Sequence, residues 1–530
     1  MTGDRCILAI DHGTSGVKVA LVSVLGEVLG GEFAPTGIRF LPGGGAEQDP
    51  DEWWSALLDS TRRLLARGLV PPDAIAGVGC SSTYSSTVAC DEAGRSIGPA
   101  LTWLDSRGAP HVRRLMRGIV NVQGYGVSNL LRFIPVTGGG PTQSGKDDVA
   151  HCLFWREERP DVWRAARWFL ASKDWFNLRL TGRAAASFDS ATLFWCTDNR
   201  DAANVRYHPG LIRRLGLDPA RLAPLARSTD VLGPLLPEVA DAIGVPRGTP
   251  VVTGACDLQS ACVGSGAVRD FEAHVYLGTS SWLLCHVPFK KTDVLHSIAS
   301  LPSAIPGRWF AANEQDQAGG CLEFLIRNVL FHPSRLAPGA APPADVWTAL
   351  DDVAASVPPG SRGVVFTPWL NGEKSPIDDE HLRGGFHNLS VRTTMDDMVR
   401  AVFEGVACNL RWVLHHVERF CGRRLDPLNL VGGGARSEVW PRILADVLGR
   451  TVRRVEHPLH ANARGAAFIA AVGLGHLRFE DVPALVRFDR VDEPCADAGT
   501  RAAYDRSYRA FTELARRMRP ICRGLNAGSR

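Results

Sequence analysis

The sequence predicts an α/β protein whose duplicated fold forms two large domains around a cleft. With 530 residues, the chain exceeds the size at which a single hydrophobic core stops growing. Gly-Thr-Ser occurs twice between apolar runs, in LAIDHGTSGVKVALVS at 8–23 and in HVYLGTSSWLLCHV at 274–287. Each copy is typical of a β-hairpin with a small, hydroxyl-bearing tip. Two such tips indicate a duplication that holds a ligand between its halves.

The composition argues against nucleic acid as a partner. Hydrophobic residues make up 45% of the chain and charged residues 22%, which is ordinary for a folded soluble protein. The formal net charge is +3, and the basic residues are scattered along the chain. The Arg-rich run RAFTELARRMRP near the end is interpreted as a solvated helix face.

The N-terminus and the cysteines favour a cytoplasmic protein. The run in MTGDRCILAID is too short for a signal peptide, and no apolar stretch reaches the roughly 18 residues that a membrane span needs. The 13 cysteines are scattered through apolar contexts without a CxxC pair, which favours reduced thiols over disulfides or a zinc site. We therefore expect no membrane partner and no metal bound to Cys or His.

The elements of the first half follow a simple order. Strands are predicted at 5–10, 17–24 and 27–34, with turns at DHGTSG and LGE. A helix follows in DPDEWWSALLDSTRRLLARG, with Asp49 or Asp51 as the expected N-cap. The next strand is IAGVGCSS.

The second half repeats this order. Its strands are HVYLGTSS, WLLCHV and HSIASLPSA, and a helix over 396–420 has an apolar face. The strand LNLVGG then leads into a helix in GARSEVWPRILADVLG. Residues 335–361, rich in Pro and Ala, predict a peripheral loop, a short helix and another loop.

The domain boundary is expected near VPRGTPVVTGACD, where a Pro and Gly cluster precedes a strand. This predicts an N-terminal domain over 1–252, a C-terminal domain over 253–475 and a helical C-terminal extension over 476–530.

The chemistry of the two tips suits phosphate. Small residues leave backbone N–H groups accessible, and the hydroxyls add donors. Asp11 at the first tip would repel phosphate unless a divalent cation lies between them, and Mg²⁺ prefers such oxygen ligands. An ordinary hairpin with a turn Asp is the alternative for either copy alone.

A third glycine-rich stretch is LVGGGARSEVW at 430–440. Three glycines between a strand and a helix allow close approach of a flat ligand such as adenine or its ribose, and a helix beginning at Ser437 would add N–H donors. Together with the two tips, this stretch indicates a nucleotide in a cleft.

The stretch GPTQSGKD at 140–147 imitates a phosphate-binding loop. The pattern fails at its last position, where Asp147 replaces the Ser or Thr that would hold Mg²⁺, and no helix of the expected kind is indicated after it. A mobile loop near the cleft, within 121–150, is the preferred interpretation, with Lys146 reaching toward the substrate.

A candidate base occurs in VVTGACDLQSACVGSG. Asp257 follows a strand and begins a helix of small residues, so its carboxylate is expected to point into the cleft between the halves. An N-cap role is the alternative for an Asp at a helix start.

These motifs, in this order, resemble the FGGY carbohydrate kinases, and among them the xylulokinase-like members. The resemblance rests on the two tips, on GACD at 254–257, on the stretch 430–452, and on GVVFTPWLNGEKSPIDDEHLRGGFHNLS, which is similar to the family's C-terminal signature. It covers about residues 5–475.

The resemblance implies an actin-like ATPase fold of two ribonuclease-H-like domains, with a sugar-binding N-terminal and an ATP-binding C-terminal domain around a catalytic cleft. Asp257 would be the catalytic base, and Asp11 would lie near Mg²⁺ and the substrate. The first phosphate loop would comprise Gly13, Thr14, Ser15 and Lys18, the second Gly278, Thr279 and Ser280, and the adenosine site Gly433, Gly434, Ala435 and Ser437.

The expected sugar pocket departs from the xylulokinase pattern. After IAGVGCS, where xylulokinases carry Gly-Gln-Met-His-Gly, this chain continues STYSSTV, with Thr83, Tyr84 and Ser85. The stretch WLDSRG retains Trp103, Asp105 and Arg107. Trp103 offers a flat face for a carbon chain, and the other two supply an acceptor and donors for hydroxyls. A local surface ion pair beside a core Trp is the alternative.

The sequence thus predicts an ATP- and Mg²⁺-dependent kinase for the terminal hydroxyl of a small ketose, foremost a pentulose such as xylulose or ribulose. Other polyols or sugar acids, of the glycerol, erythritol or gluconate type, remain alternatives. So does an actin-like regulatory ATPase without a sugar substrate. The expected partner is a small molecule, and assembly into a homodimer is left open.

Overall fold

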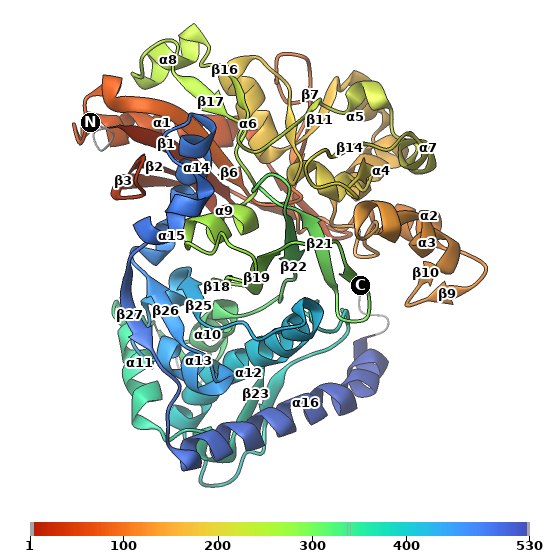
Figure 1. The fold of residues 1–530 in the computed structure, drawn as a ribbon. Coiled ribbons are helices and arrows are strands. Elements are labelled where there is room, and N and C mark those ends of the chain that lie inside the picture. The colour runs from red at the N-terminus through yellow and green to blue at the C-terminus, as the bar shows by residue number, and fades with distance from the viewer. Residues whose placement is uncertain (1–4, 336–337, 340, 527–530) are drawn as a thin grey trace.

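Two mixed β-sheets, one in each half of the chain, form the frame of the molecule (Figure 1). The computed structural model describes residues 5–335, 338–339 and 341–526. The strand order of the first sheet is β16 (Val231–Pro234), β17 (Pro250–Val252), β6 (Ile75–Ser82), β1 (Cys6–Gly13), β2 (Gly16–Ser23), β3 (Val28–Pro35). The order of the second is β20 (Thr292–Asp293), β21 (Ile298–Pro302), β22 (Trp309–Ala312), β19 (Ser281–Val287), β18 (Ala273–Leu277), β25 (Leu428–Val431), β26 (Val452–Val455), β27 (Phe488–Asp492).

The pairing of the central strands confirms the duplication. Strand β1 pairs antiparallel with β2 and parallel with β6, and β18 pairs antiparallel with β19 and parallel with β25. Each Gly-Thr-Ser turn therefore lies at the same place in its sheet, where a central strand turns back. Strands β1 and β6 are buried on both faces, which explains their nearly continuous runs of small and apolar residues.

The two long helices predicted from the sequence begin at well-formed caps. Helix α1 (Pro50–Ala66) has Asp49 as its N-cap, with the side chain accepting a hydrogen bond from the Asp51 N–H, and Pro50 at the first helical position. Helix α12 (Met395–Cys421) begins with a capping box between Thr394 and Asp397. Both helices bury an apolar face against their own domain.

Insertions decorate both frames. The first half adds a five-stranded sheet in the order β11 (Trp168–Ala171), β7 (Thr87–Cys90), β8 (Ala100–Leu101), β5 (Gly45–Gln48), β4 (Arg39–Leu41). It also adds a hairpin of β9 (Asn121–Val122) and β10 (Tyr125–Gly126). Its additional helices are α2 (Ala109–Met116), α3 (Val127–Thr137), α4 (Asp148–Glu158), α5 (Pro160–Ala165), α6 (Ser172–Thr181), α7 (Pro209–Leu215) and α8 (Pro237–Ile243). The second half adds α10 (Gly319–Leu325), α11 (Val346–Ser356), α13 (Trp440–Leu448) and the pair β23 (Val365–Thr367), β24 (Gly385–His387). Helix α11 is the short helix expected within 335–361, of which positions 336–337 and 340 lie outside the described residues.

The sequence predicts a helical C-terminal extension, but the structure also contains a strand there. It contains α15 (Val482–Leu485) and the strand β27, which pairs antiparallel with β26 at the edge of the second sheet, before the long helix α16 (Ala498–Asn526). Helix α16 runs along the base of the C-terminal half and buries Tyr504 and Phe511 against it (Figure 1). Arg516 and Arg517 of its Arg-rich run are exposed and pair with Glu513, as expected of a solvated face.

Two helices cross tightly where the halves meet. Helix α9 (Asp257–Gly264) follows β17, which belongs to the first sheet, and packs against α14 (Ala461–Gly473) from the far end of the chain. Figure 1 shows α14 lying against the strands of the N-terminal half. A Cβ on Gly465 would stand 1.8 Å from the Ser260 carbonyl oxygen, and one on Gly264 would stand 1.9 Å from that of Ala461. Only glycine at both positions permits this approach.

The structure also bears on the cysteines and on membrane association. All 13 cysteines lie within the described residues and are free thiols, twelve of them buried. Over the part of the chain that the structure describes, no helix is both long and apolar enough to cross a bilayer.

The tight crossing makes a stability prediction. Gly465→Ala should lower the free energy of unfolding by about 1–3 kcal/mol, because the methyl group forces two backbones apart. The matched change Gly524→Ala, in α16 with open space around it, should instead be neutral or stabilise by up to about 1 kcal/mol. Denaturant titration of both variants checks this. A stabilised Gly465→Ala protein would contradict the close crossing.

Candidate active site

Each Gly-Thr-Ser tip is held by hydrogen bonds from neighbouring segments. Thr14 at the first tip accepts a hydrogen bond through Oγ1 from Trp103 Nε1 at 2.8 Å, and its carbonyl accepts from Gln48 at 2.9 Å. At the second tip, the carbonyls of Gly278 and Thr279 accept from the N–H groups of Gly319 and Ala318, at 2.8 and 2.7 Å. Ser15 and Thr279 are exposed. Both tips are thus anchored from behind, with exposed residues at their ends.

The third glycine stretch lies beside the second tip. Gly432 has φ +95°, a conformation that favours glycine, and a Cβ on Gly434 would stand 2.6 Å from the side chain of Leu277, which precedes the tip. The exposed Gly433 and the buried Ala435 form a short 3₁₀ turn with their neighbours. The structure therefore brings together two stretches that are about 150 residues apart in the sequence.

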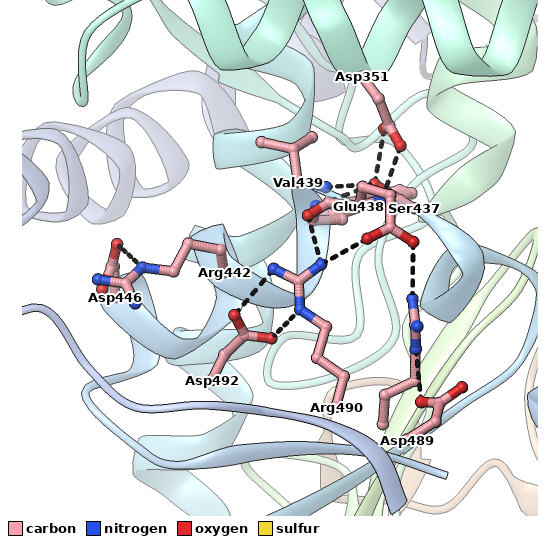
Figure 2. A network of polar contacts seen from close by, with 11 residues as sticks. Asp351, Ser437, Glu438, Val439, Arg442, Asp446, Asp489, Arg490 and Asp492 are labelled. Atoms are coloured by element: carbon pink, nitrogen blue, oxygen red, sulfur yellow. Dashed lines mark hydrogen bonds and ion pairs between the residues drawn. The ribbon is translucent and has the colours of Figure 1, made fainter. Parts of the chain in front are cut away.

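Ser437 plays a different local role from the one expected. Helix α13 begins at Trp440 rather than at Ser437, so the prediction of a helix start at Ser437 is wrong. Its Oγ donates to Asp351 at 2.6 Å and accepts from the Trp440 N–H at 2.9 Å. Figure 2 shows Ser437 at one end of a polar network in which Glu438 binds Arg490 and Arg454. This network fixes the segment that follows the glycines.

Asp257 lies at the first position of α9, not at its N-cap. The N-cap is Cys256, and Asp257 Oδ1 accepts a hydrogen bond only from the adjacent Leu258 N–H, at 2.8 Å, among its described contacts. Burial raises the pKa of Asp257 well above its usual range, and the charges of Asp11 and Glu314 raise it further. A carboxylate held this way is a strong proton acceptor once ionised.

Asp11 and Glu314 complete a group of carboxylates around Asp257. Burial raises the pKa of Asp11, opposed by Lys18, whose Nζ lies 3.9 Å from Asp11 Oδ2, and by Asn462. Burial also raises the pKa of Glu314, but Lys374 Nζ at 2.7 Å lowers it by more, so the net shift is downward. Asp11 and Glu314 therefore both act on Asp257, while Lys18, Lys374 and Lys146 offset part of the negative charge.

This charge distribution fits a divalent cation. In the described parts of the chain, no group of three or more His, Cys, Asp or Glu side chains is arranged to hold a metal by itself. Mg²⁺ usually takes one or two carboxylates and completes its shell with waters and substrate phosphates. Asp11, buried and without a short hydrogen bond in the structure, is suited to that arrangement.

The residues expected in the sugar pocket gather beside Asp257. The Tyr84 hydroxyl lies 3.4 Å from Gln259 Nε2, on α9. Burial raises the pKa of Tyr84 well above its usual value, followed by the charges of Asp189 and Cys256. Ser85 is buried, and its backbone has a φ of +54°. Tyr84 is half-buried and is therefore the more exposed of the two. Thr83 bonds to Ser86 through its hydroxyl at 3.0 Å.

The second expected pocket group is largely an internal clamp. Asp105 is fully buried and accepts bonds from the Ala46 N–H at 2.9 Å and from the backbone and side chain of Arg107. Arg107 also binds Glu47 at 2.8 Å. The expected ion pair is present, but it is largely buried instead of lying at the surface, and the half-buried Trp103 contacts the first tip and is not a core residue.

The imitation phosphate loop is closed on itself. The prediction that no helix follows it is wrong, since α4 begins at Asp148. Asp147 is buried and accepts bonds from the Thr142 N–H at 2.8 Å and from Trp195 Nε1 at 2.5 Å, and burial raises its pKa to about 6. Lys146 Nζ lies 6.0 Å from the centre of the Trp103 ring. The loop therefore presents Lys146 to the pocket instead of cradling phosphate.

Three residues near the site were not assigned from the sequence. Glu314 and Lys374 form an ion pair between positions 60 residues apart, and Gln259 bridges from α9 to the Pro302 carbonyl at 2.9 Å. Lys374 lies in the run NGEKSP, which the family signature already singled out without a role. Nothing local marks Glu314.

Comparison with known proteins identifies the family to which this chain belongs. The models of the N-terminal and C-terminal domains of the FGGY family of carbohydrate kinases match residues 6–264 and 273–474. The chain therefore belongs to the FGGY carbohydrate kinases, and it is an ATP-dependent carbohydrate kinase with the two-domain, actin-like fold of that family.

Individual relatives differ in the substrate that their names give. The chain is 26% identical over 497 residues to a xylulose kinase of Staphylococcus epidermidis, covering 92% of each chain. It is 25% identical to a gluconokinase of Bacillus subtilis, covering 89% of this chain and 88% of that one. The solved ligand-bound xylulose kinase of Lactobacillus acidophilus superposes with a TM-score of 0.82 over 99% of both chains, at 21% identity.

The raised pKa of Asp257 makes a prediction about stability. The folded state binds the Asp257 proton more tightly than the unfolded state, so this group's contribution to stability falls as pH rises above the ordinary carboxyl range. Asp257→Asn should therefore raise the Tm of the ligand-free protein at pH 8 and change it less at pH 5. Calorimetry at both pH values checks this. An equal shift at both pH values would contradict the buried, proton-binding carboxyl.

Proposed function

We propose that the enzyme phosphorylates the terminal hydroxyl of a small ketose, foremost a pentulose. The observation that carries the proposal is Asp257, a buried carboxyl at the start of α9 with raised proton affinity and a single close donor among the described residues. Two xylulose kinases among the similar proteins support a pentulose. The gluconokinase relative keeps sugar acids as the second candidate class.

The charges of the site favour a neutral sugar over a sugar acid. The negative charges of Asp11 and Glu314 already raise the pKa of Asp257. A substrate carboxylate beside these side chains would add a further negative charge. Lys374 is engaged by Glu314 at 2.7 Å. A neutral polyol, by contrast, can donate hydroxyl hydrogens to these carboxylates.

The roles follow from position. Asp257 would accept the proton of the attacking hydroxyl, and the sugar carbons would lie against Trp103 and Tyr84. Thr83 and Ser85 belong to the turn that positions Tyr84, whereas Asp105 and Arg107 fix the stretch that carries Trp103.

ATP would bind between the tips. Gly13, Thr14, Ser15 and Lys18 would contact one side of the triphosphate, and Gly278, Thr279 and Ser280 the other. The turn of Gly433, Gly434 and Ala435 would receive the adenosine, with Ser437 fixing that turn from behind through Asp351. Asp11 would hold Mg²⁺, which when bound neutralises negative charge on the phosphates.

Asp257→Asn should lower the rate of sugar-dependent ADP formation by roughly 10² to 10⁴ fold, the usual worth of a positioned base. ATP affinity should remain within a few fold, because Asp257 serves the sugar side. A coupled ADP assay and calorimetric ATP titration measure the two. Asp397→Asn, which alters a buried carboxyl at the α12 cap, is the control and should keep its activity. Near wild-type turnover in Asp257→Asn would rule out the base assignment.

A panel of ketoses, polyols and sugar acids tests the substrate. A pentulose should give the highest kcat/KM, with D-xylulose below the optimum because Tyr84 and Ser85 stand where xylulokinases carry Met and His. Tyr84→Phe should shift the ranking among the sugars by several fold, the worth of one neutral hydrogen bond of about 0.5–1.5 kcal/mol. Tyr207→Phe, which removes a hydroxyl bonded to the Ala223 carbonyl, is the control. A gluconate optimum would overturn the pentulose assignment.

A further inference from the structure

The turn that carries Asp257 is held by residues from elsewhere in the chain. Cys256, the N-cap of α9, makes no side-chain capping bond. Its N–H donates instead to Asp189 Oδ2 at 2.7 Å, across 67 residues of sequence. Asp189 is completely buried, and its other oxygen accepts from the Ser228 hydroxyl at 3.3 Å. The residue immediately before Asp257 is thus tied to a buried carboxylate.

The other end of the turn is tied to helix α6. The carbonyl of Thr253, at the end of the strand, accepts from Asn177 Nδ2 at 2.8 Å and from Lys173 Nζ at 3.2 Å. Both donors are fully buried. The segment between strand and helix is therefore held at both ends, by an acceptor on one side and two donors on the other.

These two attachments belong to one polar network. Lys173 pairs with Asp174, and Asp174 Oδ2 accepts from the Ser190 hydroxyl at 2.5 Å, next to Asp189 in the chain. Burial lowers the pKa of Lys173, but the charges of Asp174 and Asp189 raise it by more, so the ammonium stays charged. Such buried charges are costly unless each is paired and hydrogen-bonded, which makes them poor candidates for plain core filling.

The network also lies next to the pocket. After burial, the charges of Asp189 and Cys256 have the largest effects on the pKa of the Tyr84 hydroxyl. The same carboxylate therefore lies behind both the turn of the base and the tyrosine of the sugar pocket.

We propose that Asp189 is a positioning residue for phosphoryl transfer, which fixes the direction of the Asp257 carboxylate by accepting the Cys256 N–H. This inference rests on the proposed role of Asp257. Displacement of a reacting group by about 1 Å can cost on the order of 10² fold in rate. The effect should therefore fall on kcat.

Substitutions at Asp189 separate positioning from folding. Asp189→Ala removes the acceptor and should lower kcat about 10- to 100-fold per nucleotide-binding site, with the ATP dissociation constant unchanged. Asp189→Asn retains an acceptor oxygen and should keep kcat within about five-fold of wild type, a ratio that corresponds to about the net worth of one hydrogen bond. Sites are counted by calorimetric ATP titration, so a partly unfolded preparation does not imitate a loss of kcat. Should Asp189→Ala yield no folded protein, Asp189→Ser, which shortens the polar group, takes its place.

Asp397→Ala is the matched control, since it removes a buried carboxylate that caps α12. It should lower the Tm and leave kcat per site unchanged. Wild-type kcat per site in Asp189→Ala or Asp189→Ser would overturn the proposal, as would equal losses in Asp189→Asn and Asp189→Ala. Failure of the underlying function is distinguishable, because in that case Asp257→Asn itself retains full sugar-dependent turnover.

Discussion

The crossing of α9 and α14 is the constraint on which the site depends. The two helices approach so closely that Gly264 and Gly465 have no room for a Cβ. The N-terminus of α9 carries Asp257, and the N-terminus of α14 carries Asn462, whose Nδ2 lies 3.5 Å from Asp11 Oδ1. One backbone contact therefore fixes the candidate base relative to the first tip. Packed interiors transmit such displacements because they contain few voids.

The second feature of the site is an excess of negative charge. Asp11, Asp257 and Glu314 are partly or fully removed from water, and the positive charges of Lys18, Lys374 and Lys146 oppose them. In the absence of ligands, burial and the neighbouring negative charges keep the pKa of Asp257 raised. Binding of a cation with a nucleotide would relieve the repulsion, so the carboxylates that serve the reaction also make the empty site less stable than it could be.

Behind the site, polar residues hold the backbone instead of meeting the substrate. Asp105 clamps the stretch of Trp103, Asp351 clamps the turn after the third glycine stretch, and Asp189 clamps the turn of Asp257. In each case a carboxylate accepts a backbone N–H or a side-chain donor from a distant segment. Charge-assisted bonds of this type are stronger than neutral ones.

The sequence by itself determined the duplicated frame, the two tips and the third glycine stretch, because apolar periodicity and glycine-rich turns are local signals. The role of Asp257 as the base stays a prediction. The sequence did not distinguish the clamp from the pocket at Asp105, and it placed the start of α13 at Ser437 instead of Trp440. It gave no role to Glu314, Lys374 or Asp189. The Glu314–Lys374 pair spans 60 residues and the Cys256–Asp189 bond spans 67, and no local pattern encodes which buried charge meets which. Only the folded chain decides such pairs, since the pairing follows from how the sheets and helices pack.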